Sequence, residues 1–500
     1  MQHIVKKQVI DLCMEMHPDI FKTQQRVSTQ FYELVVPLME MAFNRVSKEE
    51  EVISIDQVEI DLGHLTPECV EQGQWIEAVY SKLIEKMEWL IAQGLATKSP
   101  LSKPRAYNIF QQWFFYMRNG YLPWNALEIN ESWYENVLQT LASDYDAVEF
   151  LRKEILENSR VLRRIILQHS EKFLVALTEI LTAESQATIP GAISEIQAIV
   201  KISGSSIFLP EDSPPVMTGE NNLSSHLWQM ILTLVARPEL HWSSGKIVHT
   251  ILESWIRNES SLRKIRDGLP GMLSFTETFL QEIEIKLKAS PAAVYPEPEI
   301  TAENLLERIT DKPSAKEDPH SGEDQSGFNK TLDEEGIFLS NAGLVLLHPF
   351  LSSFFNRLGL LEDGRFIDPA SQHKALHLLH YLATGKKEAA EFELQMAKIL
   401  CAFPSSGVTE MSVELNAAEI GEAGDLLSAC IQQWEVLKNT SPTGLQESFL
   451  QRNGKLFSKN GRVQLEVEKK SIDVLLDYLP WNLSLIRLPW MREVLNVNWR

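Results

Sequence analysis

The sequence predicts a mainly α-helical, multi-domain protein with small β elements. Over most of the chain, apolar residues recur at steps of three, four and seven, which places them on one face of a helix. Alternating apolar residues, which indicate strands, occur near 53–62 and in a predicted hairpin near 453–468. The 500 residues, 44% of them hydrophobic and 23% charged, are typical of a globular chain with about three domains.

The first predicted domain, residues 1–185, is helical with a short β element. Residues 19–48 have a helical pattern, in which Pro37 is the expected site of a kink. Short strands are predicted near 53–62, and the helical pattern then returns in several short segments over 67–185. The residues expected to cap these helices are Ser143, Asn158 and Ser170.

The rest of the chain divides into two linkers and two helical parts. Residues 186–222 are rich in Pro, Gly and Ser and predict a linker, which a central helical block follows at 223–288. A second linker is predicted at 289–336, because prolines recur and residues 311–335 carry eight acids against three lysines. The C-terminal helical domain is predicted at 337–500.

The predicted hairpin of the C-terminal domain depends on a turn signal. Asn460-Gly461 is a dipeptide favoured in two-residue hairpin turns, and Val463, Leu465 and Val467 alternate with polar residues directly after it. A helical domain with one small β element is therefore expected.

The charge of the chain limits its partners. It has 47 basic and 68 acidic residues and a net charge of −21, which repels the phosphates of nucleic acids and anionic lipids. No stretch approaches the run of about 18 apolar residues that a membrane span needs. The first residues also lack the apolar core of a signal peptide. We therefore expect a cytosolic protein that binds neither nucleic acid nor membrane.

The chain offers no recognisable catalytic or cofactor site. No P-loop, dinucleotide-binding glycine motif or nucleophile elbow is present. The cysteines lie far apart without a CxxC pair, so we expect small buried apolar residues instead of disulfides or a zinc site. The four cysteines are Cys13, Cys69, Cys401 and Cys430. We predict a protein that is not an enzyme and binds no cofactor.

Three histidines form the one arrangement that a metal ion could use. His373, His377 and His380 lie at i, i+4 and i+7, on one face of a predicted helix. The residues between them include no general base of the kind that a zinc hydrolase places beside its ligands. We interpret the histidines as partly buried or capping residues that hydrogen-bond carbonyl groups. A metal-dependent enzyme is the alternative hypothesis.

Leu-Pro-Trp occurs three times, and the last 20 residues hold three tryptophans. Proline fits the first turn of a helix, and a neighbouring tryptophan buries a large surface while needing one hydrogen-bond partner. One interpretation is packing between helix and hairpin, and the other is a docking face for a partner, since Trp is enriched at binding hot spots. The candidate residues are Pro123, Trp124, Pro480, Trp481, Pro489, Trp490 and Trp499.

Several long strings resemble those of a known family. The sequence is similar to the tape measure proteins of contractile injection systems, the phage-tail-like particles of bacteria. The strings that carry this resemblance near the C-terminus are SNAGLVLLHPFL (340–351), HLLHYLATG (377–385), KILCAFP (398–404), GLQESFLQRNGKL (444–456) and LLDYLPWNLSLIRLPWM (475–491). Those near the N-terminus are HIVKKQ (3–8), IDQVEIDLG (55–63) and GYLPW (120–124).

The resemblance implies a structural role in assembly. A tape measure protein sets how many rings of the inner tube polymerise, as a chain held in the tube lumen. Its implied partners are the inner tube protein, baseplate or spike components, a tube terminator or cap, and several copies of itself. The resemblance implies assembly in the bacterial cytoplasm and a final place inside the tube. An assembly chaperone or adaptor for tube or baseplate subunits is the alternative hypothesis.

The implied ruler has a length limit. A helix rises 1.5 Å per residue, so 500 residues span at most about 750 Å. The sequence, however, has 23 prolines and no apolar heptad pattern over four repeats. Either the central part extends inside the lumen, or this member is short and its terminal domains do most of the work.

Overall fold

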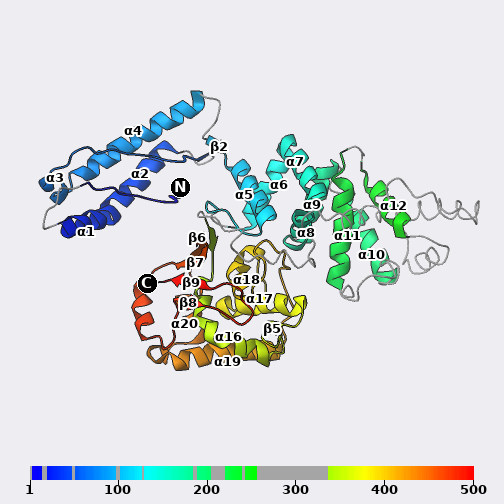
Figure 1. Ribbon diagram of the computed structural model, residues 1–500. Helices are drawn as coiled ribbons and strands as arrows, with labels where there is room; N and C mark the ends of the chain where they lie inside the picture. Colours follow the sequence, from blue (N-terminus) through cyan, green and yellow to red (C-terminus); the bar gives the residue numbers. More distant parts are fainter. Residues whose placement is uncertain are drawn as a thin grey trace, which may run out of the picture. The chain divides into compact units, whose positions relative to one another are not determined.

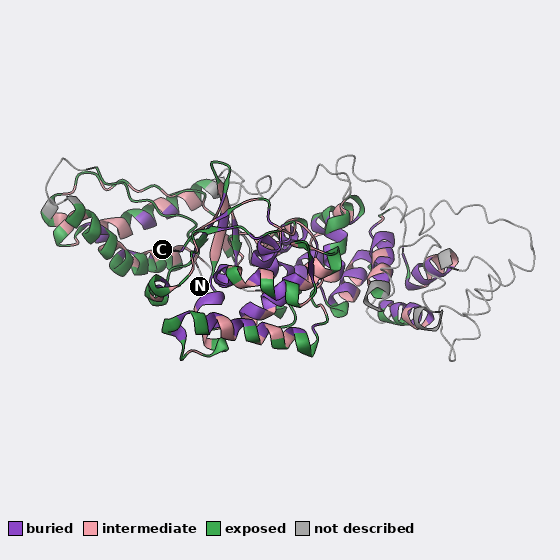
Figure 2. Ribbon diagram, turned by 60° about the horizontal axis from the view of Figure 1, so that its bottom comes forward, coloured by how far each residue is buried: buried purple, intermediate pink, exposed green. Residues whose placement is uncertain are grey.

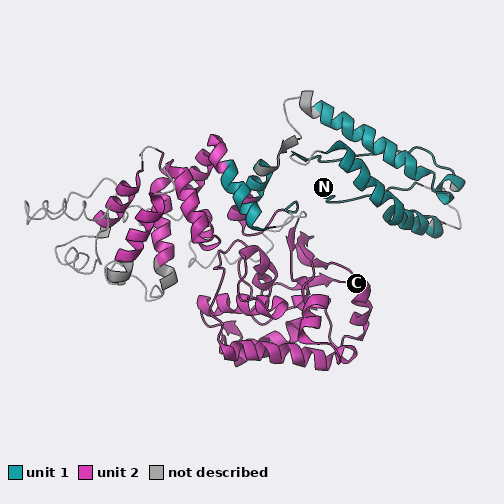
Figure 3. Ribbon diagram, turned by 180° about the vertical axis from the view of Figure 1, so that it is seen from behind, with its two compact units in different colours: residues 1–112, 124–140 teal, residues 113–123, 141–500 magenta. Residues whose placement is uncertain are grey.

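The described part of the chain is mainly helical, as predicted, with a few short strands (Figure 1). It falls into two compact units, residues 1–112 with 124–140 and residues 113–123 with 141–500 (Figure 3). No helix of the described part is both long and apolar enough to cross a bilayer. The computed structural model describes residues 3–13, 20–47, 51–96, 102–126, 129–183, 188–203, 220–238, 242–255 and 336–499.

The first unit is built on two long helical segments. One begins as α1 (Ile20–Gln30), passes through a π-helical turn (Phe31–Val35) and continues as α2 (Val36–Val46). The other is α4 (Trp75–Ala96), which packs against α2. The predicted kink at Pro37 takes the form of this widened turn just before the proline, a common response to a residue without a backbone N–H.

The strand predicted near 53–62 is much shorter in the structure. β1 (Glu51–Ile53) pairs with β2 (Ser102–Pro104), and no strand follows over 54–62. Ile55 and Ile60 instead pack against the buried residues of α2 and α4. The alternating apolar side chains therefore do face a core. The residues that carry them form no strand, however, and pack against helices α2 and α4.

Short helices follow in sequence, and their caps match the prediction at two of three places. The Asn158 side chain accepts hydrogen bonds at the start of α8, and the Ser170 side chain does so at the start of α9. Asp144 caps α7, because the predicted Ser143 is the last residue of α6. These helices are α3 (Pro67–Glu71), α5 (Arg105–Asn119), α6 (Glu131–Ser143), α7 (Tyr145–Glu157), α8 (Ser159–Leu167), α9 (Glu171–Thr182), α11 (Glu220–Val235) and α12 (Ser244–Trp255).

A helix occupies much of the linker predicted at 186–222. α10 (Ile189–Ser203) packs against α9 and α12 and buries Ile193, Ile196 and Ile199. The proline and glycine that suggested a connection lie in its first turn, where both are tolerated. The linker predicted at 289–336 lies outside the described residues except for its last one.

The C-terminal domain, residues 336–499, combines helices with a five-stranded sheet of order β3-β6-β7-β9-β8. The predicted hairpin is confirmed: β6 and β7 pair antiparallel, and Asn460 and Gly461 both have positive φ, as a type I′ turn requires. The strands are β3 (Ile337–Leu339), β4 (Leu361–Glu362), β5 (Arg365–Phe366), β6 (Gly454–Lys459), β7 (Arg462–Val467), β8 (Leu485–Ile486) and β9 (Leu495–Asn498).

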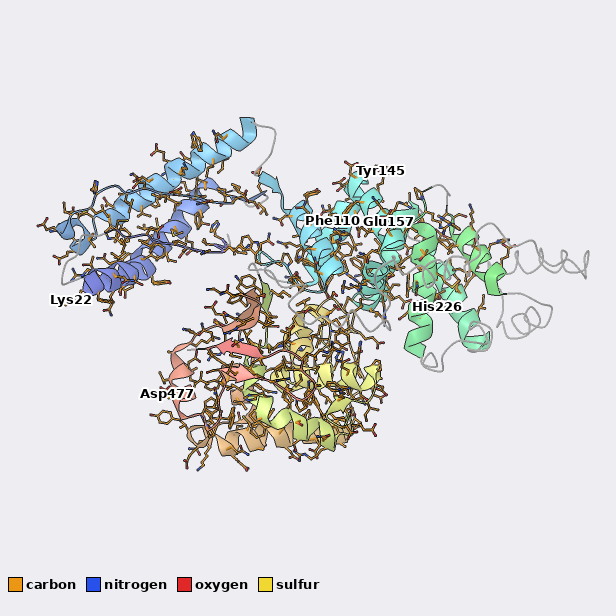
Figure 4. All side chains as sticks on the ribbon, in the orientation of Figure 1. Lys22, Phe110, Tyr145, Glu157, His226 and Asp477 are labelled. Carbon is orange, nitrogen blue, oxygen red and sulfur yellow. The ribbon has the colours of Figure 1, made fainter. Side chains whose placement is uncertain are left out.

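The helices of this domain enclose one apolar core together with the sheet, and side chains fill the space between them (Figures 2 and 4). The α-helices are α16 (His348–Arg357), α17 (Pro369–Thr384), α18 (Gln395–Leu400), α19 (Ala417–Gln433) and α20 (Pro442–Leu445). The other helical turns are η5 (Ala342–Leu347), η6 (Glu391–Leu394), η7 (Glu435–Leu437), η8 (Gln446–Leu450) and η9 (Ser471–Tyr478).

Candidate functional site

The Leu-Pro-Trp units do not start helices, contrary to the prediction. The units at 122–124, 479–481 and 488–490 all lie in turns or irregular backbone. After the first unit, the next helix in the described residues begins at Glu131, and the side chain of Asn130 caps it by accepting from the backbone N–H of Trp133, three residues further on. The fixed φ of proline serves these turns equally well.

Two of the terminal tryptophans are tied to the core of the C-terminal domain. The indole Nε1 of Trp481 donates to the carbonyl oxygen of Leu346 at 3.1 Å, and that of Trp490 donates to the carbonyl oxygen of Leu400 at 2.7 Å. Both rings pack against the apolar core. Each tryptophan thus has the single hydrogen-bond partner that a half-buried indole needs. The prolines beside them, Pro480 and Pro489, are exposed.

Trp499 belongs to a buried polar group at the end of the sheet. Its Nε1 donates to Oδ2 of Asp473 at 3.2 Å, while Nη2 of Arg452 donates to Oδ1 of the same carboxylate at 2.8 Å. The guanidinium carbon of Arg452 also lies 6.0 Å from the Trp499 ring centroid. One carboxylate therefore joins an arginine and the last tryptophan within the domain.

Trp124 differs from the terminal tryptophans because its side chain is exposed. It retains 39% exposure, and the Lys6 ammonium lies 5.6 Å from its ring centroid. This is a cation–π distance at an exposed site. Pro123, the preceding residue, is half-buried. Among the candidate tryptophans in the described residues, Trp124 alone is exposed.

The three histidines of α17 are buried or half-buried. His377 and His380 are buried, and His373 meets Phe403 edge to face with ring centroids 5.0 Å apart. The ring of His377 lies by the backbone of Glu410, but within the described part of the chain no atom has hydrogen-bonding geometry to the ring nitrogens of His377 or His380. The described residues include no group of three or more His, Cys, Asp or Glu side chains placed to hold a metal ion.

Burial keeps these histidines neutral. It lowers the pKa of His377 to about 4, with smaller contributions from the neighbouring His373 and His380. Burial also lowers the pKa of His373 to about 4, reinforced by the positive charges of Arg163 and Lys398. For His380 burial lowers the pKa, against the attraction of the nearby Glu393 carboxylate. We expect all three to be uncharged at neutral pH.

The low pKa of His377 predicts that the C-terminal domain loses stability in acid. Because the folded pKa of about 4 is below the unfolded value of 6.5, the unfolded chain binds the proton more tightly, and stability falls as pH drops from about 6.5 to about 4. At pH 5 the loss from this one group is about 2 kcal/mol. Urea denaturation followed by tryptophan fluorescence at pH 7.5 and pH 5 measures it.

His377→Leu should remove this part of the pH dependence. A matched control is Leu376→Met, a buried and non-titrating neighbour on α17, which should change stability by the same small amount at both pH values. An equal acid loss in His377→Leu and in the unmodified chain would show that His377 is not the group that titrates.

A second buried site joins residues far apart in sequence, and it lies wholly within the second unit. We call it the junction cluster: Arg164, Gln168, Glu391, Gln395 and Lys398. Nε of Arg164 donates to Oε2 of Glu391 at 2.8 Å, and Nζ of Lys398 donates to Oε1 of Glu391 at 2.7 Å. The three charged side chains have no solvent exposure. Arg164 comes from α8 and Gln168 directly follows that helix, whereas Glu391, Gln395 and Lys398 come from the C-terminal domain.

Backbone carbonyl groups complete the solvation of the two cations. They are those of Met117 and Ser406 for Arg164, and those of Ser405 and Gly407 for Lys398. Such bonds replace the water that buried charges lose. Burial lowers the pKa of Lys398 to about 8, because the cost of desolvation and the repulsion by Arg164 exceed the attraction of Glu391.

The two amides of the junction cluster link the same parts of the chain. Gln168 donates to the carbonyl oxygen of Thr409 at 2.6 Å and accepts from the backbone N–H of Glu391 at 2.8 Å. Gln395 donates to the carbonyl oxygen of Gly120 at 2.7 Å. A Cβ on Gly120 would lie 2.3 Å from Oε1 of Glu391, and its φ is +81°. Glycine is therefore required at this position on both counts.

The sequence patterns did not predict the junction cluster, although the sequence contains one signal of it. In α8, Arg164 lies on the face that buries Leu162 and Ile165. Lys398 likewise interrupts the apolar run of α18. A single charge inside an apolar stripe indicates a buried partner, because an unpaired charge in a core is costly.

The fold and these buried clusters describe a mainly helical protein in which distant segments of the second unit are joined by buried polar contacts. A family model described as "contractile injection system tape measure protein" matches residues 2–499. The chain therefore belongs to the family of contractile injection system tape measure proteins, as the resemblance predicted. Comparisons with curated proteins and with solved structures gave no match.

Proposed function

We propose that this chain acts inside the tube of a contractile injection particle as the gauge of inner-tube length. Its proposed partners are the inner tube protein, the baseplate or spike components and the tube terminator or cap. It is made and assembled in the bacterial cytoplasm and then stays in the tube. The observation that carries the proposal is the family match, which covers residues 2–499 and so includes both ends of the described structure.

Residue count explains which part of the chain can measure length. A helix advances about 1.5 Å per residue and an extended chain about 3.3 Å. A folded domain the size of 336–499 is only about 40 Å across by the size scaling of globular domains. Folded parts therefore contribute little length per residue, and residues 289–335, which the sequence predicts to be a linker, are the proposed gauge.

Shortening that segment should shorten the particle. Deleting 40 residues from 289–335 removes about 60 Å if they are helical and about 130 Å if they are extended. Because a tube grows by rings, the lengths should change in whole-ring steps. Electron microscopy of purified particles measures the length distribution.

A matched control keeps the length of the segment and changes only its order. A chain in which residues 289–335 are shuffled should give particles of the original length, and a 40-residue Gly/Ser insertion should give longer ones. Tubes of one length across the deletion, shuffled and insertion variants would reject the gauge. Mass spectrometry of purified particles separates a resident gauge from a chaperone that leaves, since only the resident chain is recovered with the tube.

The candidate tryptophans divide between two proposed roles. Trp481, Trp490 and Trp499 hold the C-terminal domain together through the contacts described above. Trp124, which is exposed, is proposed to meet another component of the particle, since aromatic residues are favoured anchors at interfaces. Pro123 stiffens the turn that presents it.

A further inference from the structure

The N-terminal part of the first unit leaves much of its apolar surface uncovered. Between residues 3 and 96, the described part of the chain buries eight apolar side chains, in two small clusters. Eleven large apolar side chains of the same part are exposed. The C-terminal domain, by contrast, buries 44 residues in one apolar cluster and exposes nine large apolar ones. A part with so small a core is stabilised when a partner covers it.

Five of the exposed side chains lie along the helical segment that runs from α1 to α2 (Figure 1). Phe21 is 84% exposed, although Phe is among the residue types most often buried, and Tyr32 is 70% exposed. The same segment turns its buried Ala42 towards the buried residues of α4. The exposed side chains therefore lie on the sides of the segment that α4 does not cover. We call them the outer face: Phe21, Tyr32, Leu34, Val36 and Met41.

Residues 3–13 enlarge this apolar surface. They form neither helix nor strand and run beside α2, where Nε2 of His3 lies 2.8 Å from Oδ1 of Asn44. Five apolar side chains of this stretch are exposed, and the most exposed is Val9, at 65%. Large apolar side chains are thus uncovered on two neighbouring stretches of chain, which is typical of an interaction surface and not of single surface residues.

The exposed area is about what one half of a stable dimer needs. An aromatic side chain has about 150 to 250 Å² to bury, and an aliphatic one has somewhat less. From the exposed fractions, the outer face offers about 500 Å² and residues 3–13 offer about 400 Å² more. A standard interface takes about 800 Å² from each partner. A partner that covers both stretches therefore forms an interface of standard size.

The charges beside the outer face favour a second copy of the chain as that partner, in antiparallel orientation. Lys22 lies near the start of the helical segment, Glu33 and Glu40 lie in its second half, and all three are exposed. Two copies that pack antiparallel around Phe31 bring Lys22 of each beside Glu40 of the other, because both residues lie nine positions from that centre. A parallel pair places like charges together, which is unfavourable.

We propose that the first unit is a self-association module, in which the outer faces of two copies pack antiparallel and residues 3–13 of each copy add to the contact. The pair supplies the apolar core that a single copy lacks. Phe21 and Tyr32 are the expected anchors, since large aromatic side chains contribute most at such contacts. The inference does not rest on the proposed function, because the pairing takes place in the free chain.

The mass of the full chain in solution tests the pairing. We expect sedimentation velocity to give twice 57.0 kDa at about 10 μM, and 57.0 kDa only on strong dilution. Phe21→Ser together with Tyr32→Ser should raise the dissociation constant by at least about 100-fold, because a two-fold dimer loses each ring twice. The matched control is Tyr145→Ser, a 74% exposed tyrosine of the second unit, which should change the dissociation constant by less than about twofold.

Charge reversal tests the orientation. Lys22→Glu and Glu40→Lys should each weaken the dimer by about 3- to 10-fold, because each places like charges together at both ends of the antiparallel contact. The two substitutions in one chain should restore the dissociation constant, since opposite charges then meet again. Circular dichroism of each variant confirms that the helices are retained.

A distance between two spin labels tests the same point independently of charge. Exposed Arg45 is replaced by Cys, after the accessible Cys13 and Cys69 are replaced by Ser, and pulsed electron paramagnetic resonance is measured on the labelled dimer. In the antiparallel pair the labels lie 14 residues to either side of Phe31, so we expect a distance of about 40 Å. A parallel pair gives less than about 20 Å, since packed helices lie about 8 to 10 Å apart.

Three results overturn the proposal. A chain that sediments at 57.0 kDa up to about 100 μM does not pair. A dimer that Phe21→Ser with Tyr32→Ser leaves unchanged pairs through another surface. A short label distance shows a parallel pair. None of these results depends on tube length: a monomeric chain with tubes of graded length rejects the pairing and keeps the gauge, and a dimer with tubes of constant length does the reverse.

Discussion

Replacing Glu391 with Gln should lower the free energy of unfolding of the second unit by about 3 to 5 kcal/mol. The substitution keeps the size of the side chain and removes the one carboxylate of the junction cluster. Arg164 and Lys398 then remain as buried cations without a counter-charge, at positions with no solvent exposure. Urea denaturation, together with hydrogen exchange of the α8 and α18 amides, measures the loss.

The matched control is Glu388→Gln, an exposed glutamate three residues earlier, which should change stability by less than about 0.5 kcal/mol. Adding Lys398→Met to Glu391→Gln removes one of the two stranded cations, so the double variant should be more stable than Glu391→Gln alone. Equal stability of Glu391→Gln and Glu388→Gln would mean that the carboxylate of Glu391 is hydrated in solution and that the cluster does not form.

Replacing Gly343 with Ala should destabilise the C-terminal domain by at least about 4 kcal/mol, in the range reserved for severe changes. A Cβ at this position would lie 1.7 Å from the carbonyl oxygen of Phe449, far inside the about 3.5 Å at which carbon atoms meet their neighbours comfortably. The obstacle is backbone of η8, which cannot turn aside as a side chain can. Thermal unfolding of the full chain gives the loss.

At two glycines of α19, in contrast to Gly343, replacement with alanine should stabilise the domain. A Cβ on Gly421 or Gly424 would have no atom within 4 Å apart from its own helix. Since Ala is a better helix former than Gly, Gly421→Ala and Gly424→Ala should each raise stability by about 0.5 to 1 kcal/mol. A similar small change in Gly343→Ala would show that η5 and η8 are not in contact.

The sequence predicted best those elements whose interacting atoms are neighbours in the chain. Asn460 and Gly461 adopt the backbone angles that their hairpin needs, and Asn158 and Ser170 cap the helices that follow them. In each case the donor and acceptor lie within a few positions, so a short stretch contains the whole interaction.

The prediction was less accurate where distant residues decide the structure. α10 is stabilised because it buries Ile193 and Ile196 and packs against α9 and α12. The residues near its proline and glycine in sequence do not reveal these packing partners. Trp481 and Trp490 were predicted to be large rings that need one hydrogen bond each. Their acceptors, however, lie 135 and 90 positions away.

The junction cluster was beyond prediction for the same reason. Arg164 is visible in the sequence as a charge on an apolar face, but nothing near it identifies Glu391 as its partner, 227 positions away. At Gly120 the positive φ after α5 is a local reason for glycine, but nothing near it in sequence shows that a Cβ would also meet the carboxylate of Glu391. A local sequence pattern can show that a charged side chain lies on an apolar face, but only the fold shows which residue supplies its counter-charge.

The strand order of the C-terminal sheet sets the time at which this domain can form during synthesis. β9 lies between β7 and β8 and pairs with both. Until the residues of β9, up to Asn498, have been synthesised, β8 therefore cannot join the other strands of the sheet. At about 5 to 20 residues per second, a ribosome needs about 25 to 100 s for 500 residues. During that interval the N-terminal helices can already fold, while β7 keeps a bare edge. Nascent chains therefore pass through a stage in which the N-terminal helices are folded while the exposed edge of β7 can still pair with a wrong strand.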